Sequence, residues 1–181
     1  MRIIAGRLRG SNLFGPSNAK IRPTSDKARE TLFNIIGPRV YDCRFLDLFA
    51  GTGAVGLEAI SRGAKSATFI DSKNVEIIRK NADKLKLVEP ADYTIIKSDA
   101  VQAMESLITV NKKFDIVFAD PPWDAGLEKK IVEMAQTLLN KNGVLILEAF
   151  YKTILPKTAP QLALVKSRKS GEAVFYFYEQ G

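Results

Sequence analysis

The residues best suited to chemistry form the run Asp120-Pro121-Pro122-Trp123. It follows an apolar stretch, residues 114–119, that is typical of a buried strand. The carboxylate accepts a hydrogen bond from an amine, the prolines lack an N–H and present carbonyl acceptors, and the indole offers a face for stacking. These residues can hold a flat ring with an exocyclic amine against a reactive group. The alternative interpretation is an Asp-Pro turn followed by a core tryptophan.

A second group of residues predicts a cofactor site. Residues 51–56 match the pattern G-x-G-x-x-G, and Asp71 follows about 20 residues later, where an acid that binds ribose is expected. Alone, this pattern indicates a dinucleotide-binding dehydrogenase, or simply a tight turn from a strand into a helix. Asp47, inside the preceding strand, argues against a dehydrogenase, because a buried carboxylate needs a partner and a cationic ligand supplies one.

S-adenosylmethionine suits these residues better than a dinucleotide does. Its ribose matches Asp71, its adenine amine matches Asp99, and its sulfonium and amino-acid end bring positive charge near Asp47. The glycines allow the backbone to approach the ligand closely. The turn at Asp120 has no role in hydride transfer, whereas it suits an amine that accepts a methyl group.

Alternating apolar segments predict the elements that position these residues. Strands are expected at residues 45–49, 67–70, 93–96, 114–119 and 144–147, and helices at 54–62, 75–85, 101–107 and 127–138, the last of these ended by Asn142-Gly143. This order predicts an α/β fold with a parallel sheet and helices on both faces. In such sheets ligands bind beyond the carboxyl ends of the strands, where Gly51, Asp71, Asp99 and Asp120 all fall.

The two ends of the chain extend this core. Residues 162–165 and 173–178 predict strands joined across 168–171, so the sheet should end in an antiparallel pair. Near the amino terminus, Ile3-Ile4 and Leu13-Phe14 flank a turn rich in glycine and arginine, which indicates a small hairpin. A helix capped by Thr24 or Ser25 should follow, with Ala28, Leu32, Ile35 and Ile36 on one face.

Composition bounds the kind of protein. The 181 residues are expected to form one domain, with a basic extension over residues 1–44 and a catalytic core over 45–181. No apolar run suits a membrane span or a signal peptide, and the single Cys43 favours a reducing cytoplasm. The absence of histidine excludes Ser-His and Cys-His triads and argues against a metal site. Nothing indicates an extended interface, so we expect a monomer.

Positive charge gathers at the two ends. Residues 1–44 hold nine Lys and Arg against three Asp and Glu, and residues 151–181 hold five against two. This distribution favours a nucleic-acid partner, although a solvated surface charge is the alternative for any single residue. The residues expected to contact phosphates are Arg7, Arg9, Lys20, Arg22, Lys27 and Arg29.

The motifs together resemble one known family. Residues 47–53 are similar to the first motif of class I methyltransferases, and residues 120–123 to their motif for exocyclic amines. Residues 1–6, 22–26, 29–30, 32–34 and 58–64 narrow the resemblance to the RsmD-type methyltransferases of bacteria, which modify the 2-amino group of a guanine in 16S ribosomal RNA. The resemblance covers nearly the whole chain. It departs at Trp123, where Tyr or Phe is more usual, and only loosely covers Lys169-Ser170-Gly171.

The resemblance implies a Rossmann-like, seven-stranded, mostly parallel sheet whose last strand is antiparallel. It implies S-adenosylmethionine as methyl donor, no metal, and the assembled or assembling small ribosomal subunit as substrate. The catalytic residues would be Asp120, Pro121, Pro122 and Trp123. The cofactor would be bound by Asp47, Phe49, Ala50, Gly51, Thr52, Gly53, Asp71, Ser72, Asp99 and Ala100. Arg22 and Thr24 match an Arg-Pro-Thr motif of the family, so the alternative to a phosphate contact is that these two residues help to close the active site.

Two other functions stay open from the sequence. The turn at Asp120 also suits an amino methyltransferase that acts on adenine N6 or cytosine N4 in DNA, since only the N-terminal motifs favour RNA guanine. A ribosome-assembly factor that binds RNA without catalysis is the other. The presence of Asp47, Gly51, Gly53, Asp71 and Asp120 argues against it, because loss of catalysis normally erodes such residues.

Overall fold

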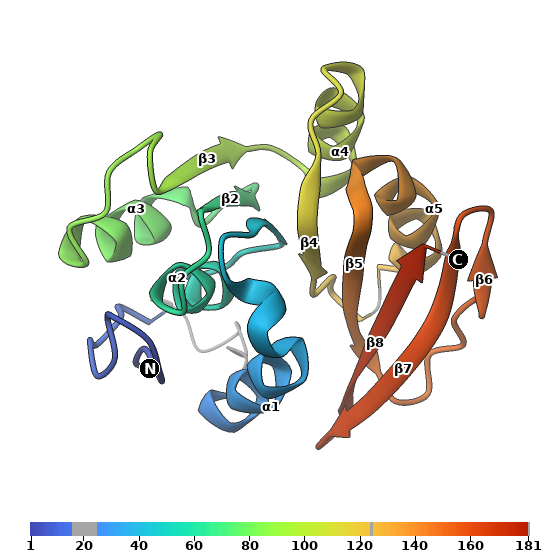
Figure 1. Ribbon diagram of the computed structural model, residues 1–181, viewed down its shortest axis with the longest axis horizontal. Helices are drawn as coiled ribbons and strands as arrows, with labels where there is room; N and C mark the ends of the chain where they lie inside the picture. The colour runs from blue at the N-terminus through green and yellow to red at the C-terminus, as the bar shows by residue number, and fades with distance from the viewer. Residues whose placement is uncertain (16–24, 124, 181) are drawn as a thin grey trace.

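A single sheet organises the chain (Figure 1). The computed structural model describes residues 1–15, 25–123 and 125–180, and within them eight strands lie in the order β3-β2-β1-β4-β5-β8-β7-β6. Strands β1 to β5 are parallel, whereas β8 is antiparallel to β5, and β7 to β8. The strands are β1 Arg44–Leu48, β2 Ser66–Asp71, β3 Tyr93–Lys97, β4 Phe114–Ala119, β5 Leu139–Phe150, β6 Thr158–Ala159, β7 Leu162–Ser170 and β8 Ala173–Gln180.

Helices cover both faces of this sheet. They are α1 Asp26–Ile36, α2 Ala54–Ser61, α3 Val75–Lys84, α4 Ala100–Thr109 and α5 Glu128–Leu138, with a short 3-10 helix at Gly37–Val40. Successive side chains of a strand point to opposite faces. Phe45 and Phe69 therefore pack in one core with α1, α2 and α3, while Leu46 and Ile70 pack in the other with α4 and α5. The predicted parallel α/β sheet with an antiparallel end is confirmed.

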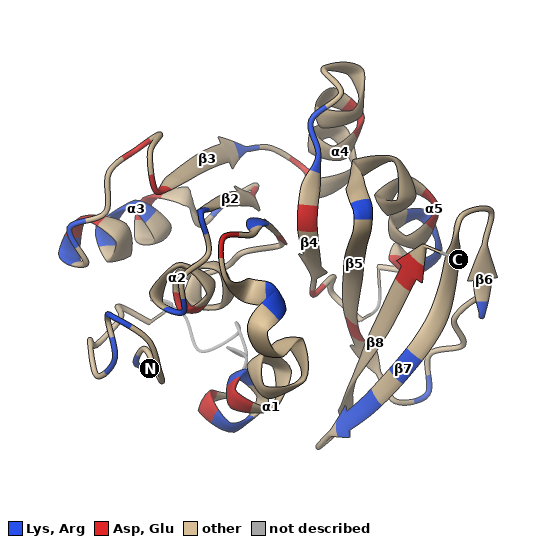
Figure 2. Cartoon of the chain, viewed as in Figure 1, with Lys and Arg blue, Asp and Glu red and all other residues tan. Residues whose placement is uncertain are grey.

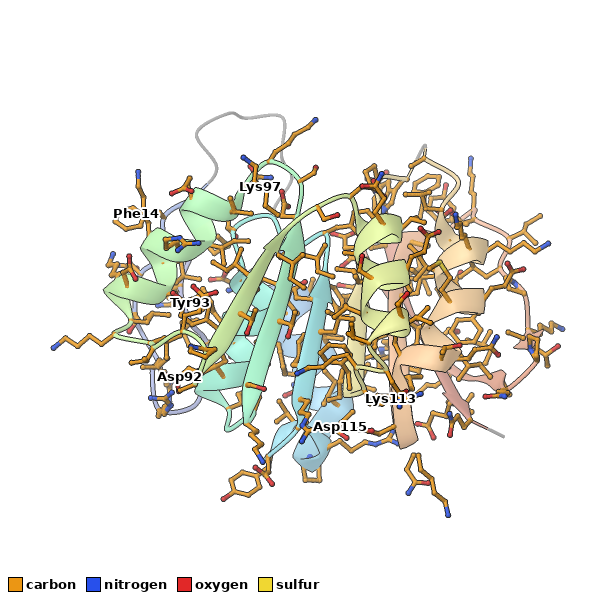
Figure 3. All side chains as sticks on the ribbon, turned by 90° about the horizontal axis from the view of Figure 1, so that it is seen from above. Phe14, Asp92, Tyr93, Lys97, Lys113 and Asp115 are labelled. Carbon is orange, nitrogen blue, oxygen red and sulfur yellow. The ribbon has the colours of Figure 1, made fainter. Side chains whose placement is uncertain are left out.

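The carboxyl ends of the central strands are aligned. Leu48, the last residue of β1, lies opposite Ile70 of β2 and Ala119 of β4. Figure 3 shows Lys97, at the carboxyl end of β3, and Asp115, near the amino end of β4, on opposite sides of the molecule. The carboxyl ends of the strands form the edge of the sheet that carries Lys97. Loops that leave β1, β2 and β4 therefore meet along one edge.

The amino-terminal hairpin is present in reduced form. Arg2 and Asn12 form an isolated antiparallel bridge, and the Ile3 N–H donates to the Ser11 carbonyl at 2.9 Å. Ser25 caps α1 as predicted, because its hydroxyl oxygen accepts a hydrogen bond from the Ala28 N–H at 3.1 Å. The other predicted cap, Thr24, lies outside the described residues.

Three boundaries near the carboxyl terminus differ from the predictions. Helix α5 passes directly into β5 at Leu139, so Asn142-Gly143 lies within the strand, where the register with β4 shifts and Asn142 has a φ of 67°. Strand β7 continues through Ser170, so Gly171 and Glu172 alone make the turn to β8. The two-residue strand β6 raises the seven strands expected to eight in the described residues.

Candidate active site

The glycine-rich loop leaves β1 and enters α2 through residues with positive φ. Phe49, Gly51 and Gly53 have φ of 64°, 57° and 77°, and the Gly53 N–H donates to the Ala50 carbonyl at 2.7 Å. A Cβ on Gly53 would lie 3.2 Å from the Ile78 side chain. The conformation and the tight packing both favour glycine here. The loop brings its backbone to the edge of the sheet, where a ligand can approach.

Asp47 is a buried carboxylate beneath this loop. Its side chain accepts a hydrogen bond from the Gly56 N–H at 2.9 Å, and the residue is 1% exposed. Burial raises the pKa of Asp47 to about 8, the Gly56 hydrogen bond opposes this rise, and the negative charges of Asp120 and Asp71 add to it. A cation at this edge would stabilise the ionised form, because an opposite charge nearby lowers the pKa of a carboxyl.

Asp71, at the end of β2, holds the loops around it. One carboxylate oxygen accepts the Gly51 N–H at 2.9 Å, and the other accepts the N–H groups of Lys73 at 2.8 Å and Asn74 at 2.7 Å. The second oxygen also accepts the Asn74 side-chain N–H at 3.1 Å, whereas the first accepts one hydrogen bond only and so keeps a lone pair for a ribose hydroxyl. Asp71 thus positions the glycine loop and remains a candidate ligand-binding acid.

The residues that follow β2 and β3 reach the same edge. Asp99 caps α4 by accepting the Val101 N–H at 2.9 Å, and Ala100 behind it is buried. Ser72 follows Asp71 and is exposed, whereas Thr52 of the glycine loop is buried. The residues expected to bind the cofactor lie on β1, β2 or the loops that leave β1, β2 and β3, except Ala100, which is the first residue of α4.

The turn predicted to be catalytic, Asp120-Pro121-Pro122-Trp123, follows β4, directly beside β1. Burial raises the pKa of Asp120 to about 7. Pro121 is buried, and the Pro122 carbonyl accepts the Ala125 N–H at 2.9 Å, which closes the turn. Trp123 is 37% exposed, and its ring centroid lies 5.0 Å from that of Phe150 at an angle of 36°. The turn therefore presents a carboxyl of raised pKa and an accessible indole beside the glycine loop.

Of the basic residues predicted to contact RNA, three are exposed in the structure. Arg7, Arg9 and Lys27 are at the surface, and Arg7 lies 3.8 Å from the carboxylate of Asp92. A cavity of about 580 Å³ separates the hairpin from α1, and it is lined by Arg2, Ile3, Ile4, Arg9, Gly10, Asp26, Lys27 and Glu30. Lys20 and Arg22 lie outside the described residues.

Arg29 has a different place from the one predicted. Its side chain is fully buried, and its guanidinium donates to the Arg2 carbonyl at 2.6 Å and to the Asp26 carboxylate at 2.9 Å. These bonds join α1 to the hairpin. The prediction of a phosphate contact is corrected to a packing role, because the guanidinium is turned into the protein.

Sequence reasoning missed two buried polar residues that hold the amino-terminal segment. Glu58 of α2 accepts the N–H groups of Ile4 at 2.8 Å and Ala5 at 3.0 Å, and pairs with Arg62 at 2.7 Å. Asn81 of α3 accepts the Phe14 N–H at 2.7 Å and donates to the Thr52 carbonyl at 2.9 Å. Asn81 thus connects the hairpin to the glycine loop. The local sequence feature that could have indicated these buried bonds is a polar residue, Glu58 or Asn81, among the apolar residues of its helix.

Neither a metal centre nor a membrane span is found in the residues that the structure describes. No group of His, Cys, Asp and Glu in the described part of the chain could hold a metal ion. In residues 1–15, 25–123 and 125–180, no helix is long and apolar enough to cross a membrane.

The ligand-free protein should lose stability as pH rises. Asp47 has a folded pKa of about 8 against an ordinary 3.8, so between these values the folded state binds more protons than the unfolded state. The stabilisation of the folded state by protonated Asp47 is fully present below pH 3.8 and is lost as the pH rises through about 8. The free energy of unfolding then falls by up to about 1.4 kcal/mol per pH unit. Urea unfolding across this range would measure the decline. Asp47→Asn should make the decline shallower, with the remainder due to Asp120, whose pKa is also raised by burial. An already flat wild-type profile would contradict the burial of an ionisable group here.

Comparison with known proteins places the chain in a family. Ribosomal RNA small subunit methyltransferase D of Escherichia coli K12 is 31% identical, with 99% of this chain and 90% of that protein covered. Its counterpart in Buchnera aphidicola from Acyrthosiphon pisum is 32% identical, with 97% and 91% covered. The solved structure of yhhF, a candidate methyltransferase from Escherichia coli, superposes with a TM-score of 0.85 at 32% identity and covers 99% of this chain and 97% of its own. A family model described as Conserved hypothetical protein 95 matches residues 1–179, and the chain belongs to that family, which is the RsmD family.

Proposed function

We propose that this protein transfers a methyl group from S-adenosylmethionine to the exocyclic N2 amine of a guanine in the 16S RNA of the small ribosomal subunit. The observation that carries the proposal is the turn Asp120-Pro121-Pro122-Trp123, which leaves β4 beside the glycine loop of β1. Methylation of small-subunit ribosomal RNA is supported by the names of relatives that match nearly the whole chain. The turn suits any exocyclic amine of a base, so the choice of guanine N2 rests on the N-terminal motifs.

The chain's residues fit S-adenosylmethionine. The buried Asp47 has a raised pKa beneath a glycine loop, and Asp71 and Asp120 add negative charge around it. Such a cluster is costly without a cation. When bound, S-adenosylmethionine supplies a methyl group on a positively charged sulfur, which is a good leaving group. Asp47, Asp71, Asp99 and the glycine loop would hold it.

The catalytic turn would position the acceptor amine. The guanine must leave its stack to reach a buried carboxylate, as in other enzymes that modify bases. Trp123 would then stack on the ring, while Asp120 and the Pro121 carbonyl accept hydrogen bonds from the two amine hydrogens. These bonds aim the nitrogen lone pair at the donor methyl. Orientation of this kind can supply effective molarities of about 10⁵ M or more.

Asp120 is also suited to receive the proton that the amine loses. Its pKa of about 7 is raised by burial. A general base works best when its pKa lies near the working pH, because a substantial fraction is then ionised and still basic enough to accept a proton. The same carboxyl can therefore orient the amine and accept its proton.

The nucleoside that becomes labelled tests the proposal. The protein would be incubated with tritiated S-adenosylmethionine and, in parallel, undermethylated small subunits, free 16S RNA, 23S RNA and DNA. We expect label in N2-methylguanosine from 16S RNA, with assembled subunits the better substrate. Label in N6-methyladenine or N4-methylcytosine from DNA would favour the DNA enzyme. Cofactor binding without any label would favour a non-catalytic assembly factor.

Lys27→Ala should weaken binding to undermethylated small subunits. Lys27 is exposed at the start of α1 and lines the cavity beside Arg9. Removing one phosphate contact lowers affinity for all sequences and reduces the slope of log affinity against log salt by about 1. Lys129→Ala is the matched control, because this lysine is exposed on α5 on the other face of the sheet. Equal salt slopes for the two variants would argue against RNA contact through Lys27.

A further inference from the structure

We propose that Phe150, Tyr151, Lys152 and Lys169 form a second nucleotide-binding surface, which takes the RNA nucleotide adjacent to the target guanine. We call these four residues the C-terminal platform. The inference rests on the proposed function, since it assigns a further part of the same RNA to the same edge of the sheet. Phe150, Tyr151 and Lys152 were not considered as RNA contacts from the sequence, and Lys169 lies in a turn that the family resemblance covers only loosely.

The platform continues the aromatic surface of the catalytic turn. Phe150 ends β5, and its ring centroid lies 5.0 Å from that of Trp123 and 4.6 Å from that of Tyr151. Strands β4 and β5 are parallel neighbours, with Ala119 opposite Leu147, so both chains leave the sheet at the same edge. Three rings, those of Trp123, Phe150 and Tyr151, therefore form a row that begins at the turn after β4. Tyr151, at the outer end, is 42% exposed.

Positive charge lies directly on this aromatic surface. The Lys169 ammonium is 4.6 Å from the Tyr151 ring centroid, and that of Lys152 is 5.6 Å away. Residues 150–171 contain five Lys and Arg and no Asp or Glu. Figure 2 shows this charge along β7 toward its turn with β8. An aromatic ring flanked by cations is the combination that binds single-stranded nucleic acid, through stacking and phosphate contacts.

The backbone fixes the turn against Tyr151. The Tyr151 N–H donates to the Glu172 carbonyl at 2.9 Å, which joins the end of β5 to the turn between β7 and β8. Lys169 pairs with Val174 in this hairpin, so its side chain is delivered to the ring by regular strand structure. The platform is thus built on the ends of strands rather than on a free loop.

The lysines over the ring do not prevent a base from stacking there. An exposed cation–π contact is weaker than the stacking of a base on an aromatic ring, so a base can displace a flexible lysine side chain. The displaced ammonium then lies near the phosphate of the same nucleotide. A flipped guanine leaves its neighbours without a stacking partner on one side, and the platform would supply one.

Tyr151→Ala tests the stacking step. With undermethylated small subunits we expect KM to rise about tenfold, within the range for removal of one base–aromatic stack, and kcat to change less than about twofold. Affinity for S-adenosylmethionine should stay at the wild-type value. Tyr151→Phe keeps the ring and should restore the wild-type KM. Tyr41→Ala is the matched control, because Tyr41 is 76% exposed and precedes β1, at the opposite edge of the sheet.

The lysines are tested by salt dependence. The double variant Lys152→Ala/Lys169→Ala should reduce the slope of log affinity against log salt by about 2, or about 1 for each phosphate that is no longer neutralised. Lys65→Ala, an exposed lysine just before β2, should leave it unchanged.

The outcomes separate this inference from the proposed function. If the wild type forms N2-methylguanosine and Tyr151→Ala has the same KM as Tyr41→Ala, the platform is refuted and the proposed function stands. A KM for Tyr151→Phe as high as that of Tyr151→Ala would also refute it, because stacking needs only the ring. If the wild type labels no ribosomal RNA, the proposed function fails and the platform fails with it.

Discussion

Asp120→Ala should lower the rate of methyl transfer by about 10³-fold, near the middle of the range for loss of a positioned proton-transfer group. The alanine removes both the acceptor that orients the amine and the group that takes its proton. Affinity for S-adenosylmethionine should change little, because the residues proposed to bind it lie on β1, β2 and the loops after β1, β2 and β3. Transfer would be measured with tritiated donor and undermethylated subunits, and donor affinity by calorimetry.

Two further variants sharpen this result. Asp120→Asn keeps one carbonyl acceptor but cannot take a proton, so it should lie between the alanine variant and the wild type. Asp83→Ala removes an exposed carboxylate of α3 and should leave the rate unchanged. The wild-type rate should increase as pH rises through the Asp120 pKa of about 7, because only the ionised carboxyl accepts both hydrogen bond and proton. Normal turnover by the alanine variant would remove Asp120 from the mechanism.

Glu58→Ala should destabilise the protein by about 3–5 kcal/mol, the cost of removing one partner from a buried ion pair. The glutamate is fully buried, accepts the N–H groups of Ile4 and Ala5, and pairs with Arg62, which is itself mostly buried. Its removal leaves two backbone donors and a guanidinium without this acceptor. Unfolding in urea would measure the change in free energy.

The matched control for Glu58 is Glu133→Ala in α5. Glu133 also faces a basic residue one helical turn away, Lys129 at 3.9 Å, but both side chains are exposed. Exposed pairs of this kind contribute about 1 kcal/mol or less. Because Glu58 anchors the hairpin, its variant should also bind small subunits more weakly. Equal stability of the two variants would show that the bonds of Glu58 contribute nothing to holding the hairpin, which Arg29 and Asn81 also bind.

The sequence allowed the sheet and the edge that carries the site to be predicted, because each strand is an apolar run that ends in a loop of distinctive residues. Asp47, Asp71 and Asp120 could be placed together in this way, since parallel strands end at a common edge. The boundary between α5 and β5 at Leu139 could not be predicted, because Leu138 and Leu139 are both apolar and fit either a helix or a strand.

The prediction that Arg29 contacts phosphate came from the excess of basic residues in residues 1–44, and it was wrong. It lies on the same helical face as Leu32, Phe33 and Ile36, three, four and seven residues further on, so its spacing already indicated burial. The need for glycine at position 56 arises from tertiary packing. A Cβ at this position would lie 2.3 Å from the Phe69 ring, a contact between α2 and β2 that no local pattern reveals. The bonds of Glu58 and Asn81 to the hairpin span 53 to 67 residues and were equally hidden.

Trp123 is the one tryptophan in the chain, and its indole is partly exposed beside Phe150. With excitation that tryptophan absorbs and tyrosine does not, the emission of the protein therefore originates at the turn proposed to hold the acceptor base. A base stacked on the indole would quench this emission directly, whereas a donor bound at the glycine loop would reach it only through Asp120 and the turn. One cuvette, with no attached dye, can thus follow the arrival of each substrate in turn.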